Sequence, residues 1–176
     1  MSDIYLILHN VRSLHNVGSI FRTADAAGVK KIYLTGYTPL PYDFFGKLHK
    51  DFAKTALGAE KYILWEQRRN ISGLLKSLRK GGEVFVVSLE QSPRAIPYNK
   101  LTTTYRSKLK KYDSISLIVG NEIRGLSRAI LKKSDAVVEI PMYGRKESLN
   151  VAVAAGIVLF SLREQFGHIQ VNDVLY

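Results

Sequence analysis

Residues 114–127 form a short apolar run that stops at a polar turn: Ser114-Ile-Ser-Leu-Ile-Val-Gly-Asn-Glu-Ile-Arg-Gly-Leu-Ser127. A run of this length without charged residues is typical of a strand that is buried on both faces of a parallel sheet. Gly120 lets the backbone come close to a ligand, and Gly125 permits a tight bend. Ser127 is a suitable cap for a following helix. We therefore predict a strand, a turn beside a ligand, and a helix in this order.

Four more apolar runs of strand length occur along the chain, and helical patterns separate them. We predict strands at 4–8, 31–35, 83–88, 114–119 and 136–140, and helices near 17–27, 71–80, 126–133 and 151–165. This alternation predicts an α/β fold in which a parallel sheet carries helices on both faces. Ligands of such sheets bind at the carboxyl ends of the strands. Polar residues that follow a predicted strand are therefore the first candidates for a site.

The composition excludes several classes of protein. With 176 residues, nearly half of them apolar, the chain suits one domain with a sizeable core. No stretch reaches the ~20 apolar residues that span a bilayer, and the first apolar run lacks the basic flank of a signal peptide. The absence of cysteine excludes disulfides, thiolate metal sites and cysteine nucleophiles. The four histidines show no metal-ligand spacing, so we expect a protein without a metal. Without a spanning stretch or a signal peptide, we also expect it to be cytoplasmic and to lack a membrane anchor.

The charge of the chain indicates a polyanionic partner. Lys and Arg number 26 against 15 Asp and Glu, which gives a formal net charge of +11. Such an excess attracts nucleic acid, because basic side chains neutralise phosphates. The basic residues gather in two clusters, at 68–80 and at 100–112. Each cluster alone is also compatible with a solvated helix face, and neither distinguishes RNA from DNA. We expect phosphate contacts from six residues: Arg68, Arg69, Arg106, Lys108, Lys110 and Lys111.

Two further segments place polar residues at predicted strand ends. Asn16-Val-Gly-Ser-Ile-Phe-Arg22-Thr-Ala24 follows the first strand and opens a helix, in which Arg22 lies off the apolar stripe. An arginine in this position is able to grip a phosphate with two hydrogen bonds. Ile140-Pro-Met-Tyr-Gly-Arg-Lys-Glu-Ser148-Leu-Asn150 leads into the last helix. Each segment alone is also compatible with an ordinary capped helix, because asparagine and serine are common helix caps. The residues able to cap are Asn16, Ser148 and Asn150.

Together and in this order, the three segments resemble the motifs of the SPOUT superfamily, in particular its SpoU/TrmH-like branch of RNA ribose 2′-O-methyltransferases. The matching patterns are Asn16-x-Gly18-x-x-x-Arg22-x-Ala24, Gly120-Asn121-Glu122-x-x-Gly125-Leu126 and Ile140-Pro-Met142-x-Gly144-x-x-x-Ser148-Leu-Asn150. The segment 54–59, Lys-Thr-Ala-Leu-Gly-Ala, also looks like a family feature. The resemblance covers nearly the whole chain.

The resemblance implies a fold, a cofactor and a set of roles. The C-terminal part would form a deep trefoil knot, with S-adenosyl-L-methionine bent inside it. Arg22 would be the central catalytic residue, and the methyl group would go to a ribose 2′-hydroxyl of tRNA or rRNA. Around Arg22 would lie Asn16, Glu122, Ser148 and Asn150. The cofactor would contact Leu89, Gly120, Asn121, Ile140, Met142 and Leu149.

The resemblance also bears on assembly and domain organisation. The wholly apolar segment 151–160 is expected to be buried on every side, in the core of a monomer or against a second subunit. Family membership favours the homodimer. Many relatives carry an additional RNA-binding domain, whereas we expect residues 1–176 to form a single catalytic domain. The sequence does not name the RNA or its nucleotide.

Three other functions compete with this interpretation. A dinucleotide-binding or Rossmann-type enzyme would need a G-x-G-x-x-G turn after the first strand, which the residues after 8 lack. A non-catalytic RNA-binding protein would explain the charge but not the polar sets at three strand ends. A SPOUT methyltransferase acting on a base nitrogen is the third, and the segment from Asn16 to Arg22 favours the ribose branch over it.

Overall fold

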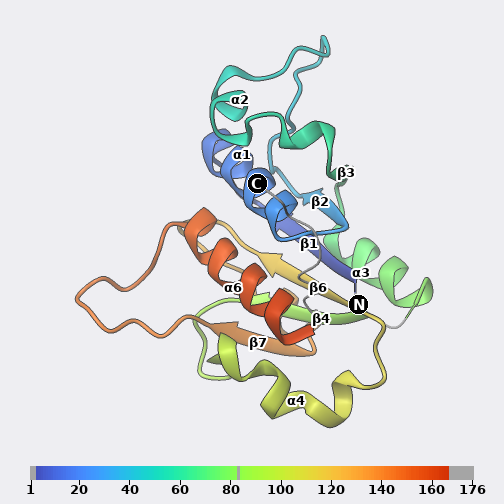
Figure 1. Ribbon diagram of the computed structural model, residues 1–176, viewed down its shortest axis with the longest axis vertical. Helices are drawn as coiled ribbons and strands as arrows, with labels where there is room; N and C mark the ends of the chain where they lie inside the picture. Colours follow the sequence, from blue (N-terminus) through green and yellow to red (C-terminus); the bar gives the residue numbers. More distant parts are fainter. Residues whose placement is uncertain (1–2, 83, 167–176) are drawn as a thin grey trace, which may run out of the picture.

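The computed structural model describes residues 3–82 and 84–166. Within this part of the chain there are seven strands: β1 (Asp3–His9), β2 (Lys31–Thr35), β3 (Leu64–Arg68), β4 (Val84–Leu89), β5 (Ile96–Pro97), β6 (Ser114–Val119) and β7 (Ala136–Glu139). They form one sheet in the order β3-β2-β1-β6-β4-β7-β5 (Figure 1). Every pairing is parallel.

Helices cover both faces of this sheet, which confirms the predicted α/β architecture (Figure 1). One face packs against α1 (Leu14–Ala26), α2 (Lys50–Ala56), α4 (Leu101–Leu109) and α6 (Val151–Phe166). The other packs against α3 (Ile71–Lys80) and α5 (Arg128–Leu131). Two 3₁₀ turns, η1 (Ala59–Lys61) and η2 (Tyr98–Lys100), precede β3 and α4. No helix among the described residues is long and apolar enough to cross a membrane.

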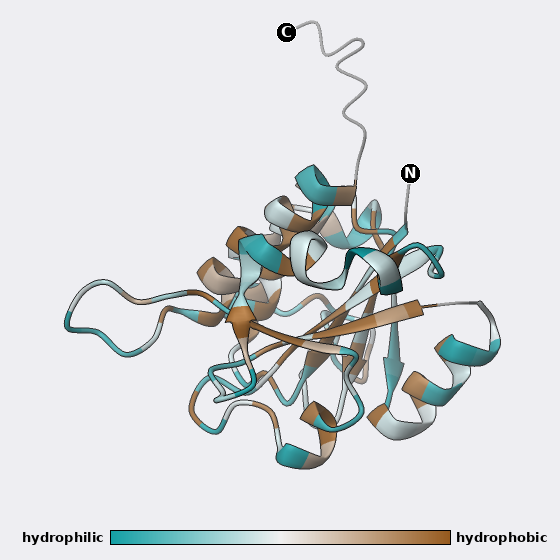
Figure 2. Cartoon of the chain, turned by 90° about the horizontal axis from the view of Figure 1, so that it is seen from below, coloured by the Kyte–Doolittle hydropathy of each residue, from teal (hydrophilic) through white to brown (hydrophobic). Residues whose placement is uncertain are grey.

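Alternating side chains of the strands divide the core between the two faces. Leu6 and Leu8 of β1 face the layer of α1 and α6, whereas Ile7 between them packs with α3 and α5. All three are fully buried. Because both faces are covered, the strands need no polar alternation, which explains their continuous apolar sequence. Figure 2 shows hydrophobic residues along much of the central sheet, whereas the helices contain both hydrophobic and hydrophilic residues.

The predicted element boundaries agree with the structure where the strands are buried. The strands at 31–35 and 114–119 and the helix at 71–80 have the predicted bounds. The strand predicted at 83–88 is observed as Val84–Leu89, and residue 83 lies outside the described residues. Four elements were not predicted: β3, β5, α2 and α4. β3 is an edge strand with three exposed residues, so its sequence lacks the apolar run of a central strand.

The first helix begins earlier than predicted, and its cap is a different residue. Ser13 is the N-cap, and its hydroxyl accepts a hydrogen bond of 3.3 Å from the backbone N–H of Asn16. Asn16 therefore lies in the first turn, which leaves its side chain available for other contacts. Gly18 lies against α2, since a Cβ there would come within 2.6 Å of the Phe52 carbonyl oxygen. A glycine at this position therefore permits the close approach of α1 and α2.

The last helix is apolar all round but is buried on one side only within this chain. Ala155, Val158, Leu159 and Leu162 are buried against the sheet and α1. In contrast, Val153 is 52% exposed and Phe160 is 47% exposed. Burial in the core of a monomer, one of the two alternatives expected for this segment, is therefore wrong, and burial against a second subunit stays a prediction. The loop that joins β7 to α6 projects from the body of the molecule beside this helix (Figures 1 and 2).

Candidate functional site

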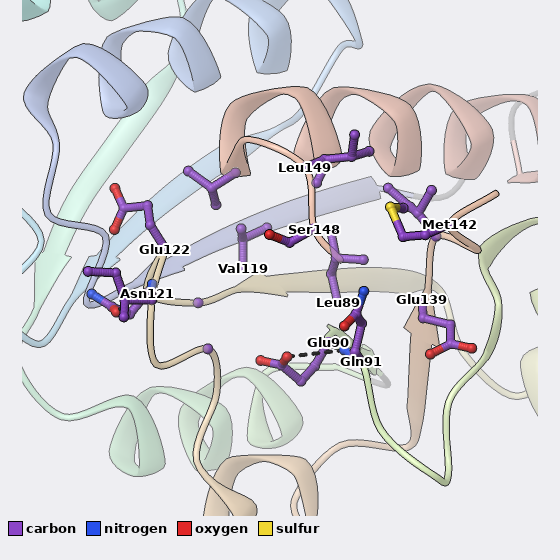
Figure 3. Close-up of a pocket in the computed structure, with 16 residues that line it drawn as sticks. Leu89, Glu90, Gln91, Val119, Asn121, Glu122, Glu139, Met142, Ser148 and Leu149 are labelled. Atoms are coloured by element: carbon purple, nitrogen blue, oxygen red, sulfur yellow. Dashed lines mark hydrogen bonds between the residues drawn. The ribbon is translucent and has the colours of Figure 1, made fainter. Parts of the chain in front are cut away.

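A pocket of about 250 Å³ lies where the carboxyl ends of β4, β6 and β7 meet the loop before α6 (Figure 3). We call it the carboxyl-end pocket. Glu122 and Ser148 of the predicted catalytic set line it. Its lining also contains all six residues predicted to contact a cofactor: Leu89, Gly120, Asn121, Ile140, Met142 and Leu149. Segments that are distant in sequence thus converge on one cavity.

The lining of this pocket is acidic, although the chain as a whole is strongly basic. Glu90, Glu122 and Glu139 contribute carboxylates, and no lysine or arginine is found among the described residues that line it. Apolar side chains, including Val119 and Val151, form much of the remaining wall. Carboxylates favour a cationic ligand and repel phosphate groups. The pocket therefore suits a compact ligand with positive charge and an apolar ring, rather than a nucleotide phosphate.

The turn after β6 is held in shape by a carboxylate from the neighbouring strand. Gly125 has φ +61°, a left-handed conformation that favours glycine, and a Cβ at this position would collide with Glu90. The Glu90 carboxylate accepts a hydrogen bond of 2.6 Å from the backbone N–H of Leu126. Gln91, the next residue, donates to the Glu147 carbonyl at 2.5 Å. The end of β4 therefore ties both the turn after β6 and the loop before α6 to the pocket.

Asn121 connects the same turn to the ends of β1 and β2. Its Oδ1 accepts from the backbone N–H groups of Ile123 and Arg124, at 2.9 and 2.8 Å. Its Nδ2 donates to the Asn10 carbonyl at 2.9 Å and to the Tyr37 hydroxyl at 3.0 Å. The side chain is 7% exposed and fully hydrogen-bonded. We infer that Asn121 shapes the pocket rather than reacting with a ligand.

A chain of hydrogen bonds links the three motif segments. The Asn150 Nδ2 donates to Asn16 Oδ1 at 3.1 Å, and the Asn16 Nδ2 donates to Glu122 Oε1 at 3.0 Å. Asn150 also caps α6, because its Oδ1 accepts from the Ala152 N–H at 2.8 Å. The expected capping role of Asn150 is confirmed. Its hydrogen bond to Asn16 is an additional contact that capping does not require. The first turns of α1 and α6 are thus joined to Glu122 at the rim of the pocket.

Glu122 is held as a carboxylate by the start of α1. Burial raises its pKa, but the backbone N–H groups of Arg12 and Ser13 and the side chain of Asn16 outweigh that effect, so the pKa is lowered overall. A carboxylate that accepts three N–H groups is a weak base. This arrangement suits a residue that fixes its neighbours more than one that removes a proton.

A sequence model of the SpoU rRNA Methylase family matches residues 3–160. This chain belongs to that family. Among its relatives, the tRNA (guanosine(18)-2′-O)-methyltransferase of Aquifex aeolicus is 32% identical over 93% of this chain and 70% of its own length. The 23S rRNA (guanosine(2553)-2′-O)-methyltransferase RlmP of Bacillus subtilis is 34% identical over 90% of this chain, but this match covers only 57% of RlmP.

Solved structures of the SpoU family have the same fold. The AdoMet-bound rRNA methyltransferase from Sinorhizobium meliloti superposes with a TM-score of 0.79 at 30% identity, covering 94% of this chain and 58% of that protein. The A. aeolicus TrmH/SpoU tRNA modifying enzyme gives a TM-score of 0.75 at 28% identity, covering 94% of this chain and 76% of that protein. The chain therefore spans little more than half of the Sinorhizobium protein.

Arg22 of this SpoU-family chain lies apart from the carboxyl-end pocket. It is exposed on α1 and is not part of the lining. Within residues 3–82 and 84–166, no hydrogen bond or ion pair engages its guanidinium, whereas Glu122 interacts with Arg12, Ser13 and Asn16 instead. Glu122 therefore makes no hydrogen bond or ion pair with Arg22 in this structure. An exposed guanidinium remains available to a ligand outside the chain.

The structure separates the two basic clusters that were predicted to bind RNA. Arg68 and Arg69 lie at the carboxyl end of the edge strand β3, where Arg68 forms an ion pair with Glu66. Lys110 and Lys111 lie just before β6, at the amino end of the sheet (Figure 1). A six-residue strand spans roughly 20 Å, so this second cluster is remote from the pocket. Within this second cluster, Tyr105 is partly buried and packs on the core residue Phe85, at 5.7 Å between ring centroids.

Sequence reasoning missed several residues at the pocket. Glu90 and Gln91 directly follow the buried strand β4, so the rule that singles out polar residues after a strand would have found them. Exposed basic residues at the same edge were missed as well, because they are scattered in sequence: Arg12, Arg124, Arg145 and Lys146. Their sequence neighbours give no signal that the fold brings them to one side.

Proposed function

We propose that this SpoU-family chain transfers a methyl group from S-adenosyl-L-methionine to a ribose 2′-hydroxyl of tRNA or rRNA. The observation that carries the proposal is one acidic pocket, in a chain of net charge +11, that is lined by the second and third motif segments and connected to the first by the hydrogen bond from Asn16 to Glu122. The named relatives from A. aeolicus and B. subtilis methylate guanosine riboses in tRNA and in 23S rRNA. An acidic pocket on a basic protein suits an enzyme whose cofactor is cationic and whose substrate is anionic.

The residues of the pocket fit the cofactor. The S. meliloti relative is described as bound to AdoMet. When bound, this cofactor supplies an electrophilic methyl group on a positively charged sulfur. In the present chain, the carboxylates of Glu90, Glu122 and Glu139 favour positive charge, while Leu89, Ile140, Met142 and Leu149 offer apolar surface to an adenine ring. Gly120 and Asn121 would hold the turn against the ligand.

Polar residues of the pocket and of the helix α1 would together position the RNA. We assign to Arg22 the contact with a phosphate next to the target ribose and the stabilisation of negative charge that develops on the 2′-oxygen. Free guanidinium has a pKa above ~12 and rarely loses its proton, so Arg22 would act as a charge rather than a base. As the methyl group leaves the sulfur for the 2′-oxygen, the hydroxyl proton would pass to solvent water. Ser148 and Asn150 would orient the ribose. Asn16 and Glu122 would keep Asn150 in place through the observed hydrogen bonds.

The RNA is expected to approach the carboxyl edge of the sheet. Arg12, Arg124, Arg145 and Lys146 are exposed there, and Arg68 and Arg69 lie at the same edge of β3. These side chains are better placed for phosphates near the pocket than the cluster of Arg106, Lys108, Lys110 and Lys111. The latter would contribute only to an RNA that extends around the sheet to its amino end. We therefore favour the carboxyl edge of the sheet as the RNA contact, although the sequence treats the two surfaces alike.

We also propose a homodimer and a knotted C-terminal part. Val153 and Phe160 are about half exposed and lie two turns apart on the outer side of the last helix, and a second copy of the chain would cover them. The knot is supported by the topology, since β6 and β7 lie between strands that precede them in sequence. We further propose that residues 1–176 act as a single catalytic domain in the cytoplasm, where tRNA and rRNA would be available.

The test is methyl transfer from labelled cofactor to tRNA and rRNA isolated from cells that lack this gene. Digestion to nucleosides and mass spectrometry should then reveal a 2′-O-methylated nucleoside. A label on a base nitrogen would replace the ribose assignment by base methylation. Failure of both cofactor binding and transfer, with RNA binding intact, would identify a non-catalytic RNA-binding protein. Running the cofactor titration with a chelator present checks that no metal is needed.

A further inference from the structure

The connection between β2 and α2, residues 36–49, exposes two phenylalanine rings. It rises beyond α2 at the upper end of Figure 1. We call it the aromatic arm. Phe44 is 97% exposed and Phe45 is 90% exposed, and their rings pack edge to face at 5.6 Å between centroids. Large apolar side chains with so little burial usually mark a surface that meets another molecule.

The tip of the arm is locally ordered by hydrogen bonds. The Asp43 Oδ1 accepts from the backbone N–H groups of Phe45 and Lys47, both at 2.9 Å. The Asp43 N–H donates to the Lys47 carbonyl at 2.9 Å, and Gly46 adopts φ +76° to complete the turn. Because the turn is already ordered, binding would cost little conformational entropy at this loop. Most of the free energy gained from contacts of the rings would therefore contribute to affinity.

The base of the arm is anchored to the body and to the pocket. Tyr42 stacks on Trp65 at 6.2 Å between ring centroids, and Thr38 is buried with its hydroxyl hydrogen-bonded to the Leu8 carbonyl. At the start of the arm, the Tyr37 hydroxyl accepts a hydrogen bond from Asn121, which lines the carboxyl-end pocket. One loop therefore runs from the pocket to the exposed rings.

Basic side chains accompany the rings. Lys47 belongs to the turn itself, and Lys50 begins α2 directly after the arm; both are exposed. Asp43, the acidic residue of the tip, uses its Oδ1 to hold the turn. Aromatic faces beside basic residues form the combination that binds single-stranded nucleic acid, because bases stack on the rings while phosphates meet the cations.

We propose that the aromatic arm binds an unpaired segment of the RNA substrate by stacking a base on Phe44 and Phe45. This inference rests on the proposed function, since it assigns a contact for the same substrate. A protein partner would depend on the apolar area of the two rings rather than on their flat faces. A second copy of the chain would bury the two rings in a dimer interface. These alternatives predict different responses to a change from phenylalanine to leucine.

The experiment compares binding of a short oligoadenylate and of a blunt RNA duplex to the full chain. Phe44→Leu with Phe45→Leu keeps apolar area but removes the rings, and should weaken oligoadenylate binding roughly tenfold or more. The slope of log K against log salt should stay unchanged, because no phosphate contact is lost. Lys47→Ala with Lys50→Ala should instead reduce that slope. Phe45→Trp should retain affinity, and its fluorescence should be quenched by the oligonucleotide.

The matched control is Tyr62→Leu, because Tyr62 is an aromatic residue with 80% exposure outside the arm. It should leave binding unchanged. The inference would be overturned if the double leucine variant bound oligoadenylate as tightly as wild type. It would also be overturned if the double leucine variant differed from wild type in oligomeric mass. If wild type neither binds RNA nor transfers methyl groups, the proposed function fails; if wild type and the leucine variant do both equally well, only the arm assignment fails.

Discussion

The side-chain amide of Asn150 donates a hydrogen bond of 3.1 Å to the amide oxygen of Asn16, which lies 134 positions earlier in the chain. Asn16 in turn donates to Glu122, so this contact connects the start of the last helix with the start of the first helix and with the rim of the pocket. Both asparagines belong to motif segments. Their pairing explains why an amide, which both donates and accepts, occupies each position.

Asn150→Asp should separate this contact from helix capping. Aspartate is as good an N-cap as asparagine, so the stability of α6 should change little. Its carboxylate has no N–H to donate to Asn16, and the ribose-orienting group would be displaced. We expect single-turnover methyl transfer to fall at least tenfold while the midpoint of thermal unfolding stays within a few degrees. A fully active variant would show that the hydrogen bond has no role in positioning.

Arg22→Ala should reduce the rate of methyl transfer by about 10² or more, the effect of removing one electrostatic donor from a transition state. Cofactor affinity should remain at the wild-type value, because Arg22 does not line the pocket. Arg22→Lys should also fail, since a point charge cannot reproduce a bidentate contact. Lys76→Ala, an exposed cation on α3, is the control. A rate above about a tenth of wild type would correspond to less than ~1.4 kcal/mol and would reject the assignment.

Glu122→Gln tests the charge at the pocket rim. Hydrogen bonds to a carboxylate are stronger than those to an amide, so the variant should be less stable at neutral pH. The loss should be at most about 1 kcal/mol, because solvent screens a partly exposed group. The pKa of Glu122 is lowered from 4.5, so its charged form stabilises the fold above that value and loses this effect as the pH falls through the lowered pKa. Urea unfolding should therefore show the two proteins converging in acid. A difference that persists there would have another cause.

Val153→Glu and Phe160→Glu should convert a dimer into a monomer without unfolding it, because both side chains are about half exposed in the single chain. Val158→Glu should instead unfold the protein, since Val158 is 1% exposed and a buried unpaired charge is strongly destabilising. Sedimentation velocity and circular dichroism distinguish these outcomes. A wild-type protein of monomeric mass at micromolar concentration would contradict the dimer.

Gly18→Ala should destabilise the fold. Its Cβ would come within 2.6 Å of the Phe52 carbonyl oxygen, a backbone atom that cannot move aside easily. Overpacking of this kind costs about 1–3 kcal/mol, which exceeds the ~1 kcal/mol that alanine gains over glycine in a helix. Gly144→Ala serves as the control, since no atom lies within 4 Å of its Cβ. Equal thermal stability of the two variants would show that α1 and α2 adjust at no cost.

The fold was predictable where elements are buried and uniform. β2 and β6 have continuous apolar sequences because both of their faces are covered, and their predicted bounds agree with the structure. β3 was missed because an edge strand such as Leu64–Arg68 is largely solvated and has the composition of a loop. The extent of burial of α6 could not be read from its sequence either. An apolar helix has the same residues whether one chain or two surround it.

The site was predictable to the extent that it follows strand ends. The six residues expected around a cofactor all line the pocket, because the carboxyl ends of parallel strands meet at one edge. Their actual contact with a cofactor remains a prediction. The partners of Glu122 and the separation of the basic clusters were beyond sequence reasoning. They depend on which strands are neighbours. β6 pairs with β1, which precedes it by more than a hundred residues, and with β4, which precedes it by more than twenty.

The position of β6 has a consequence for synthesis on the ribosome. Its two partners in the sheet, β1 and β4, are both translated before it, and β7 reaches its place beside β4 later still. Until residues 114–119 have emerged, β1 and β4 each present a bare hydrogen-bonding edge that neighbouring nascent chains are able to occupy. The nascent chain is therefore most prone to aggregate during its own translation, and slower elongation before β6 would prolong that exposure.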